Sequence, residues 1–186
     1  DIIRYSVDAD GIATLTIDYP GKTMNVIDGD FMGSLSAGID RVVADPAEAV
    51  KDAAGNPGES ARLMTMTPSS FELISGDDGL TLPLMAVGCT AVIGVATHWT
   101  GVDHQEMFAK WNAGDTAGAR QVNARLTESF AFETGDDNPN PLPTKVMMNH
   151  LGLDVGEARL PMGPPPAGLA ERAAKVMANL VAARAR

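Results

Sequence analysis

The lysine that ends the short run AEAVK, residues 47–51, is the first side chain of this sequence that could do chemistry. In parallel α/β folds, the reacting groups lie at the carboxyl ends of the strands. A neutral amine held at such a place is a nucleophile and can form a Schiff base with a keto acid. The alternative interpretation of Lys51 is a solvated charge at the end of a strand, and the sequence position alone leaves both open.

Two other short stretches could place backbone groups beside a small ligand. In SGDD, residues 75–78, Gly76 would let the backbone approach a ligand closely. The carboxylate of Asp77 or Asp78 could instead cap the helix that follows, which is the favoured interpretation of these two residues. A backbone carbonyl in IGV, residues 93–95, could also face a ligand, but packing in the core is the favoured interpretation of this stretch.

Other kinds of site find little support in the sequence. The three histidines lie in no HExxH or CxxC context, and the chain has no P-loop and no GxGxxG. We therefore expect no metal and no cofactor. The single cysteine, Cys89, has no base close to it in the sequence and is interpreted as a small buried residue.

The elements that must position these residues alternate along the middle of the chain. Short apolar runs bounded by turns predict strands that end at residues 51, 76 and 96. Helical spacing between and after them predicts helices over 58–67, 79–88, 103–114, 116–132 and 145–153. Short apolar strands alternating with helices indicate a parallel sheet covered by helices, which places the chain in the α/β class.

The two ends of the chain differ from this middle part. Residues 4–18 predict a β-hairpin around DADG, and the apolar spacing from Asp28 to about Val43 predicts a helix. At the C-terminus, an apolar stripe predicts a docked helix, against a calmodulin-like or membrane-surface alternative; its members are Leu169, Ala173, Val176, Leu180 and Val181. We expect three segments, over residues 1–46, 47–133 and 134–186.

Composition limits the partners that this chain of 186 residues could have. Its net charge of −10 argues against nucleic acid or an anionic membrane as the main partner. No apolar run reaches the roughly 18 residues that a membrane helix needs. A single cysteine cannot form an internal disulfide, so a reducing cytoplasm is the expected location.

From about Val50 onward, the sequence resembles the C-terminal part of dihydrodipicolinate synthase and its pyruvate-aldolase relatives. The segments that carry the resemblance are VKDAAGN, FELISGDDGLTLPLMAVGCTAVIGVA, WNAGDTAGAR, NPNPLPTKVMMNHLGL and ARLPMGPP. They follow one another in the order of the family with nearly its spacing. The resemblance implies a TIM-type (β/α)₈ barrel followed by a small helical C-terminal domain.

By this resemblance, Lys51 matches the Schiff-base lysine, Gly76 a residue beside the bound substrate, and Ile93 a residue whose backbone contacts pyruvate. The family condenses pyruvate with aspartate semialdehyde in lysine and diaminopimelate synthesis, so a lyase without cofactor is implied. Its members are usually homotetramers, and we expect a homo-oligomer here.

The resemblance covers only a partial barrel, because about 50 residues precede Lys51 and a complete barrel needs roughly 250 in all. The family's Gly-Thr-Thr-Gly-Glu loop and its proton-relay tyrosine and neighbouring arginine have no counterpart. Tyr5 and Tyr19 lie in another context. We therefore expect impaired turnover, since the loss of positioned acid–base groups costs about 10²- to 10⁴-fold in rate.

The first 45 residues, RYSVDADGIATLTIDYPGKTMNVID and the stretch to RVVADP, resemble the start of an enoyl-CoA hydratase (crotonase) domain. That resemblance stops before the oxyanion-hole loop and catalytic glutamates of the crotonases. The sequence therefore predicts a chimera joined near residues 45–50. Three functions stay open: a Schiff-base lyase, an acyl-CoA binder or hydratase, and a non-catalytic structural protein.

Overall fold

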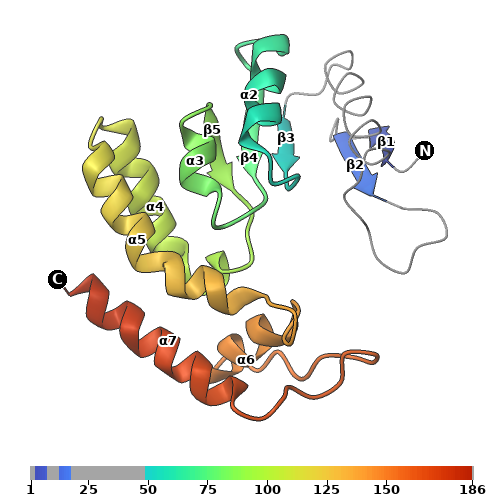
Figure 1. The fold of residues 1–186 in the computed structure, drawn as a ribbon, viewed down its shortest axis with the longest axis vertical. Helices are drawn as coiled ribbons and strands as arrows, with labels where there is room; N and C mark the ends of the chain where they lie inside the picture. The colour runs from blue at the N-terminus through green and yellow to red at the C-terminus, as the bar shows by residue number, and fades with distance from the viewer. Residues whose placement is uncertain (1–2, 8–12, 18–48, 186) are drawn as a thin grey trace.

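The computed structural model describes residues 3–7, 13–17 and 49–185 (Figure 1). The first two ranges are the strands β1 (Ile3–Val7) and β2 (Ala13–Ile17), which pair antiparallel with Tyr5 opposite Leu15. They agree with the predicted hairpin. The helix predicted from residue 28 to 43 lies outside the described residues, as does most of the crotonase-like segment.

A three-stranded parallel sheet occupies the middle of the chain, in the order β3-β4-β5. Its strands are β3 (Ala49–Asp52), β4 (Glu72–Ser75) and β5 (Cys89–Val92). Lys51 lies opposite Ile74, and Ile74 lies opposite Ala91. The predicted parallel sheet is confirmed, but β5 ends at Val92 and not at residue 96.

Within residues 49–185, six helices cover and extend this sheet. They are α2 (Pro57–Met66), α3 (Thr81–Met85), α4 (Thr97–Asn112), α5 (Thr116–Glu133), α6 (Leu142–His150) and α7 (Leu169–Arg184). The start of α2 follows from its sequence, because the Asn56 side chain accepts the Gly58 and Glu59 N–H groups and Pro57 fits the first helical position. Helix α4 begins six residues before the predicted Asp103.

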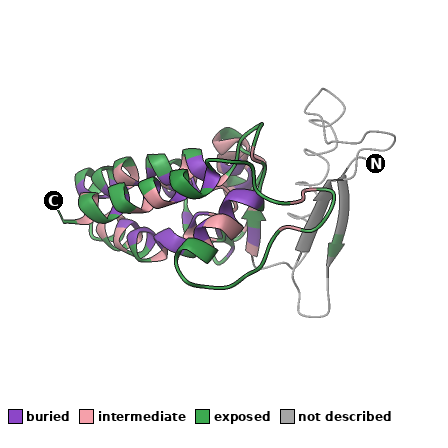
Figure 2. Ribbon diagram, turned by 90° about the horizontal axis from the view of Figure 1, so that it is seen from below, coloured by how far each residue is buried: buried purple, intermediate pink, exposed green. Residues whose placement is uncertain are grey.

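The helices after the sheet pack on one another and form most of the core. Helices α4 and α5 run along each other, and α7 lies against α5 and α6 (Figure 1). Met107, Leu126 and Met147, from three different helices, are fully buried between them. Figure 2 shows the buried residues on the sides of these helices that face one another.

The C-terminal helix α7 is docked through the predicted apolar stripe. Leu169, Ala173, Val176 and Leu180 are buried, while Val181 is exposed. Burial of a Leu or Val side chain contributes roughly 1.5–3 kcal/mol, so this face can hold α7 without a partner. The docked-helix interpretation is confirmed for these four residues.

Candidate active site

The three residues predicted for the site lie at one edge of the parallel sheet. Lys51 is near the end of β3, Gly76 directly follows β4, and Ile93 directly follows β5. Two backbone hydrogen bonds extend the ladder to this edge: Gly76 N–H donates to the Asp52 carbonyl at 2.6 Å and Ile93 N–H to the Ser75 carbonyl at 2.8 Å. The carboxyl ends of three neighbouring strands therefore bring these residues together.

Gly76 is required here by space. A Cβ atom at this position would lie 2.9 Å from Lys51 Cε and 2.8 Å from the Asp52 carbonyl oxygen. Both distances are shorter than real Cβ contacts. A glycine at this position therefore leaves room for the backbone after β3 and for the Lys51 side chain, whose Cε atom lies next to Gly76.

The site edge is open in the described part of the chain. The Lys51 side chain is exposed, and Ile93 is 55% exposed. The interpretation of Ile93 as a core residue is therefore wrong, because its side chain leaves the core while its backbone stays bonded to β4. Lys51 and Ile93 both lie where a small molecule could reach them.

The end of β3 is fixed by Asp52, next to Lys51. One carboxylate oxygen of Asp52 accepts the Ala54 N–H at 2.8 Å, and the other accepts the hydroxyl of Ser60 in α2. Ser60 is buried. These two hydrogen bonds tie the stretch of backbone that carries Lys51 to the first turns of α2.

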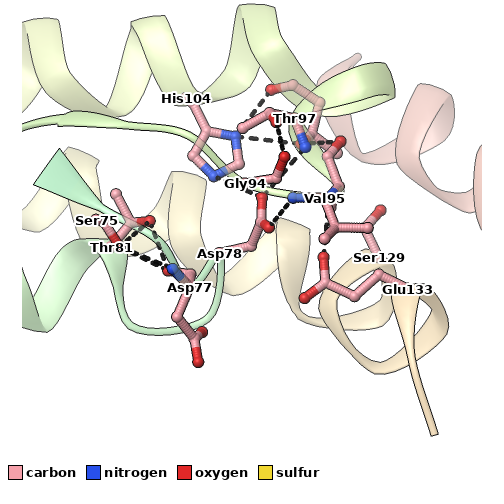
Figure 3. A network of polar contacts seen from close by, with 12 residues as sticks. Ser75, Asp77, Asp78, Thr81, Gly94, Val95, Thr97, His104, Ser129 and Glu133 are labelled. Carbon is pink, nitrogen blue, oxygen red and sulfur yellow. Dashed lines mark hydrogen bonds and ion pairs between the residues drawn. The ribbon is translucent and has the colours of Figure 1, made fainter. Parts of the chain in front are cut away.

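The SGDD stretch divides its two carboxylates between two helices. Asp77 Oδ1 accepts the N–H of Leu80, the residue before α3, at 3.1 Å, so capping is confirmed for Asp77. Asp78 instead reaches the segment between β5 and α4. Its two carboxylate oxygens accept the N–H groups of Val95 at 2.5 Å and Thr97 at 3.1 Å (Figure 3).

A second carboxyl group, from the last residue of α5, meets the same segment. Glu133 Oε2 accepts the Ala96 N–H at 2.9 Å. Burial, and next the charge of Asp78, raise the pKa of Glu133 to about 8, against the opposing effect of the Ala96 hydrogen bond. Glu133 therefore holds its proton at neutral pH.

A buried histidine completes this polar cluster. His104 Nε2 lies 3.8 Å from Asp78 Oδ1 and has no hydrogen-bond partner, while Nδ1 lies 3.1 Å from the Thr100 carbonyl (Figure 3). Sequence reasoning missed Glu133 and His104. The one available signal was that Ala96, at the start of α4, offers no side chain to cap the helix.

One hollow near the sheet is lined by residues of β5 and α4 and does not include Lys51. It has a volume of about 460 Å³ and lies along β5 and α4. Its lining includes Val92, Thr97, His104 and Phe108. We place the candidate site at Lys51 because the strand ends that meet at this edge of the sheet carry a nucleophile, whatever the size of a hollow elsewhere.

Other expected features can be located within the described residues. Cys89 is buried, and burial raises the pKa of its thiol, in agreement with a small core residue. Residues 3–7, 13–17 and 49–185 contain no group of three or more His, Cys, Asp or Glu side chains placed to hold a metal ion. In the same ranges, none of the helices is long and apolar enough to cross a bilayer.

Comparison with known proteins gives a consistent result. The family model of the dihydrodipicolinate synthetase family matches residues 7–181. The 4-hydroxy-tetrahydrodipicolinate synthase of Bacillus subtilis is 34% identical over 155 residues, covering 82% of this chain and 50% of the relative. A crystal structure of dihydrodipicolinate synthase from Bacillus anthracis is 35% identical with a TM-score of 0.69, over 75% of this chain and 49% of that one.

A crystal structure of the enzyme from Cyanidioschyzon merolae, with lysine bound, is 31% identical with a TM-score of 0.70, over 77% of this chain and 48% of that one. The chain thus spans about half the length of the relatives it matches, and its fold is a partial TIM-type β/α barrel with C-terminal helices. The family match begins at residue 7, within the crotonase-like segment, and these comparisons give the crotonase resemblance no support.

Proposed function

Because the chain belongs to the dihydrodipicolinate synthetase family, we propose that it binds a keto acid of the pyruvate class as a Schiff base on Lys51. The observation that carries the proposal is the approach of the Lys51 side chain to Gly76, at the ends of adjacent parallel strands. Gly76 leaves the space beside the end of the Lys51 side chain free of a Cβ atom, so a ligand bound to the amine could lie there.

The proposed reaction begins with attack of Lys51 Nζ on the keto carbon of pyruvate. Loss of water leaves an iminium, which withdraws electrons from the neighbouring methyl carbon, so that a proton can leave and an enamine forms. The enamine carbon is the nucleophile for condensation with an aldehyde, for which we propose aspartate semialdehyde. The chain would accordingly act as a 4-hydroxy-tetrahydrodipicolinate synthase-type lyase.

Gly76 and Ile93 would hold the keto acid through their backbones. At Gly76 no Cβ atom blocks a ligand bound to the lysine. The backbone of Ile93 is fixed by its bond to the Ser75 carbonyl and lies on the next strand along the same edge. These two residues are proposed as substrate-binding positions at the ends of the two strands that follow β3 in the sheet order.

For residues 1–186 by themselves, we propose imine formation with little condensation. The family's relay tyrosine and substrate-carboxylate loop have no counterpart in this sequence. Without positioned acid–base groups, proton transfer to and from the enamine should be slower by about 10²- to 10⁴-fold. Condensation with aspartate semialdehyde at the rate of a complete family member would contradict this part of the proposal.

We further propose a cytoplasmic homo-oligomer. Ile93 and Val102 are 55% and 64% exposed, and among the described strands β5 is at the edge of its sheet. Exposed apolar side chains beside an unpaired strand edge favour association. Gel filtration at micromolar concentration tests this, and a mass equal to one chain would contradict it.

Borohydride trapping tests the proposed nucleophile directly. The protein is incubated with pyruvate and sodium borohydride, and the adduct is located by intact mass and peptide mapping. Hydride reduces the imine to a secondary amine, so the chain gains the mass of pyruvic acid less one oxygen. We expect one adduct, on Lys51, that disappears in Lys51→Ala.

The matched control is Lys175→Ala, which removes an exposed lysine of α7 far along the chain from the site. This variant should label as the wild type does. Absence of an adduct, or labelling spread over several lysines, would show that Lys51 occupies the family position without its chemistry.

A further inference from the structure

Helix α4 begins without a cap of its own. Its N-cap residue is Ala96, whose side chain cannot accept a hydrogen bond. The first N–H groups of a helix have no partner within the helix and need one from elsewhere. In this chain, those partners are Asp78 and Glu133, from two distant elements.

The two carboxyl groups bind three successive backbone amides. Asp78 takes the N–H groups of Val95 and Thr97, and Glu133 takes the N–H of Ala96 between them. Asp78 is 1% exposed, so this arrangement excludes solvent from its carboxylate. Hydrogen bonds from amides to a buried carboxylate are among the stronger ones in proteins.

Gly94 allows the close approach of Asp78. A Cβ atom at Gly94 would fall well inside contact distance of both carboxylate oxygens of Asp78. The segment 93–97 thus wraps around a carboxylate that follows β4, two residues after Gly76. Ile93, at the start of this segment, is bonded to the same strand through the Ser75 carbonyl.

We propose that the carboxyl groups of Asp78 and Glu133 position the backbone of residues 93–97 at the edge of the keto-acid site. The role of Ile93 in this inference rests on the proposed function. The hydrogen bonds between the two carboxyl groups and the backbone of residues 95–97 are independent of that function. The pair acts on a keto acid only through the segment that it holds, so both are positioning residues and neither touches the substrate.

Protonation of the pair should regulate how firmly the segment is held. At neutral pH, protonated Glu133 can donate to Asp78 while accepting from Ala96, and the pair carries one negative charge. Above about pH 8, loss of that proton places a second negative charge, on the partly buried Glu133, beside Asp78. The charged pair repels itself, so we expect the hold on residues 95–97 to weaken.

The two aspartates of the SGDD stretch agree with this direction. Asp77 and Asp78 face it from the loop after β4 and both favour its protonated form. His104, on α4, faces Asp78 through an unbonded Nε2. Arg172, on α7, donates to the Ala131 carbonyl, two residues before Glu133.

The test combines amide hydrogen exchange with borohydride trapping on the full 186-residue chain. Asp78→Asn replaces one acceptor oxygen with an NH₂ group, so one of the two amides at 95 and 97 loses its partner. We expect at least about tenfold less protection there, and a similar rise in the pyruvate concentration for half-maximal trapping at Lys51. The matched control is Asp115→Asn, which changes another helix-capping aspartate, one that accepts the Gly118 N–H at the start of α5.

Glu133→Gln separates the proposed role from a merely structural one through the pH dependence of hydrogen-exchange protection. Glutamine can still accept the Ala96 N–H and donate to Asp78, but it does not titrate. We expect protection of residues 95–97 in the wild type to fall as pH rises from 7 to 9 and to stay level in Glu133→Gln. Glu128→Gln, a control at an exposed acid on the same helix, should follow the wild type.

Unchanged protection in Asp78→Asn, or the same pH dependence in Glu133→Gln as in the wild type, would overturn the positioning role. Lost protection with an unchanged pyruvate dependence would overturn its link to the site. If the wild type forms no adduct at all, the proposed function fails by itself, and hydrogen exchange still decides whether the carboxyl pair holds the segment.

Discussion

Two aspartates of this chain are equally buried and are accommodated in opposite ways. Asp78 and Asp103 are each 1% exposed. Asp103, on α4, is bound by two arginines: Arg125 of α5 at 2.9 Å and Arg184 of α7 at 2.5 Å. Asp78 is bound by backbone amides and faces a second carboxyl group and a histidine.

The difference appears in the titration of each cluster. Burial alone would raise the pKa of Asp103, but the hydrogen bonds and charges of Arg184 and Arg125 hold that pKa below its usual value. Burial and the charge of Asp78 raise the pKa of Glu133 to about 8. The arginine cluster thus stays ionised over the physiological range, whereas the acid pair changes charge within it.

The comparison teaches that equal burial does not imply an equal role. Asp103 joins α4, α5 and α7 to one another through permanent charges. Asp78 and Glu133 join the loop after β4, the segment 93–97 and the end of α5, beside the strand ends that carry Lys51 and Ile93. A cluster that changes charge near pH 8 suits a segment that must be held beside a ligand.

The largest effect on stability should come from the arginine cluster. Asp103→Asn leaves the partly buried guanidinium of Arg184 without its charge partner and leaves that of Arg125 with Glu106. Loss of one partner of a buried ion pair costs about 3–5 kcal/mol, and we expect about 2–3 kcal/mol because Arg125 and Arg184 keep 19% and 29% side-chain exposure. Urea unfolding measures the free energy.

Glu106→Gln is the matched control for Asp103→Asn. Glu106 also contacts Arg125, but its side chain is 41% exposed. Glu106→Gln should therefore lower the unfolding free energy much less than Asp103→Asn does. An equal loss in the two variants would show that burial of the carboxylate does not govern the strength of this cluster.

The next effect tests whether Gly94 exists to admit Asp78. Gly94→Ala should destabilise the chain by about 1–3 kcal/mol, as overpacking of a filled site does. In an Asp78→Ala background, the carboxylate that a new Cβ would meet is gone. A double-mutant cycle by urea unfolding should then give a coupling energy of about 0.5–3 kcal/mol. Additive losses would mean that Gly94 is required for another reason.

A third effect is the opposite pH dependence of the two clusters. Glu133 binds a proton more tightly in the folded state, so its contribution to stability is greatest below its ordinary pKa of 4.5 and is lost as pH rises to about 8. Glu133→Gln should therefore gain stability relative to the wild type between pH 5 and 8. Thermal unfolding at fixed ionic strength measures this difference.

Asp103 should behave in the reverse sense. Its lowered pKa gives stability that is present above its unfolded value of about 4 and is lost as pH falls below it. Relative to the wild type, the stability of Asp103→Asn should therefore rise as pH falls into the acid range, whereas that of Glu133→Gln should fall as pH drops from 8. Parallel pH profiles for the two variants would contradict the comparison.

Much of the fold could be predicted because its signals are local. Apolar runs such as FELISG and TAVIGVA gave the positions of two of the parallel strands, and the stripe Leu169, Ala173, Val176 and Leu180 indicated the face that α7 buries. The ends of elements were less predictable. Strand β5 ends earlier than predicted, and α4 begins earlier. The reason is that Asp78 accepts the N–H groups of Val95 and Thr97, which a longer strand would have directed to other partners.

The candidate site was predictable in part for a similar reason. Lys51, Gly76 and Ile93 could be placed at strand ends from the family resemblance, and the structure brings them to one edge. The cluster behind them could not, because Asp78, His104 and Glu133 are distant in sequence and share no motif. Its members meet only after α4 and α5 pack beside the sheet.

The smallest expected effect concerns an exposed ion pair and sets the baseline for both buried clusters. Lys110 lies 3.9 Å from Glu106 and 3.6 Å from Asp115, with 36% of its side chain exposed. Exposed pairs contribute about 0–1 kcal/mol, because water screens the charges and ordering the side chains costs entropy. Lys110→Ala should therefore change the unfolding free energy by less than about 1 kcal/mol, and 1 M salt should remove most of the change. A loss as large as that of Asp103→Asn would mean that burial is not what separates the strong pairs of this chain from the weak ones.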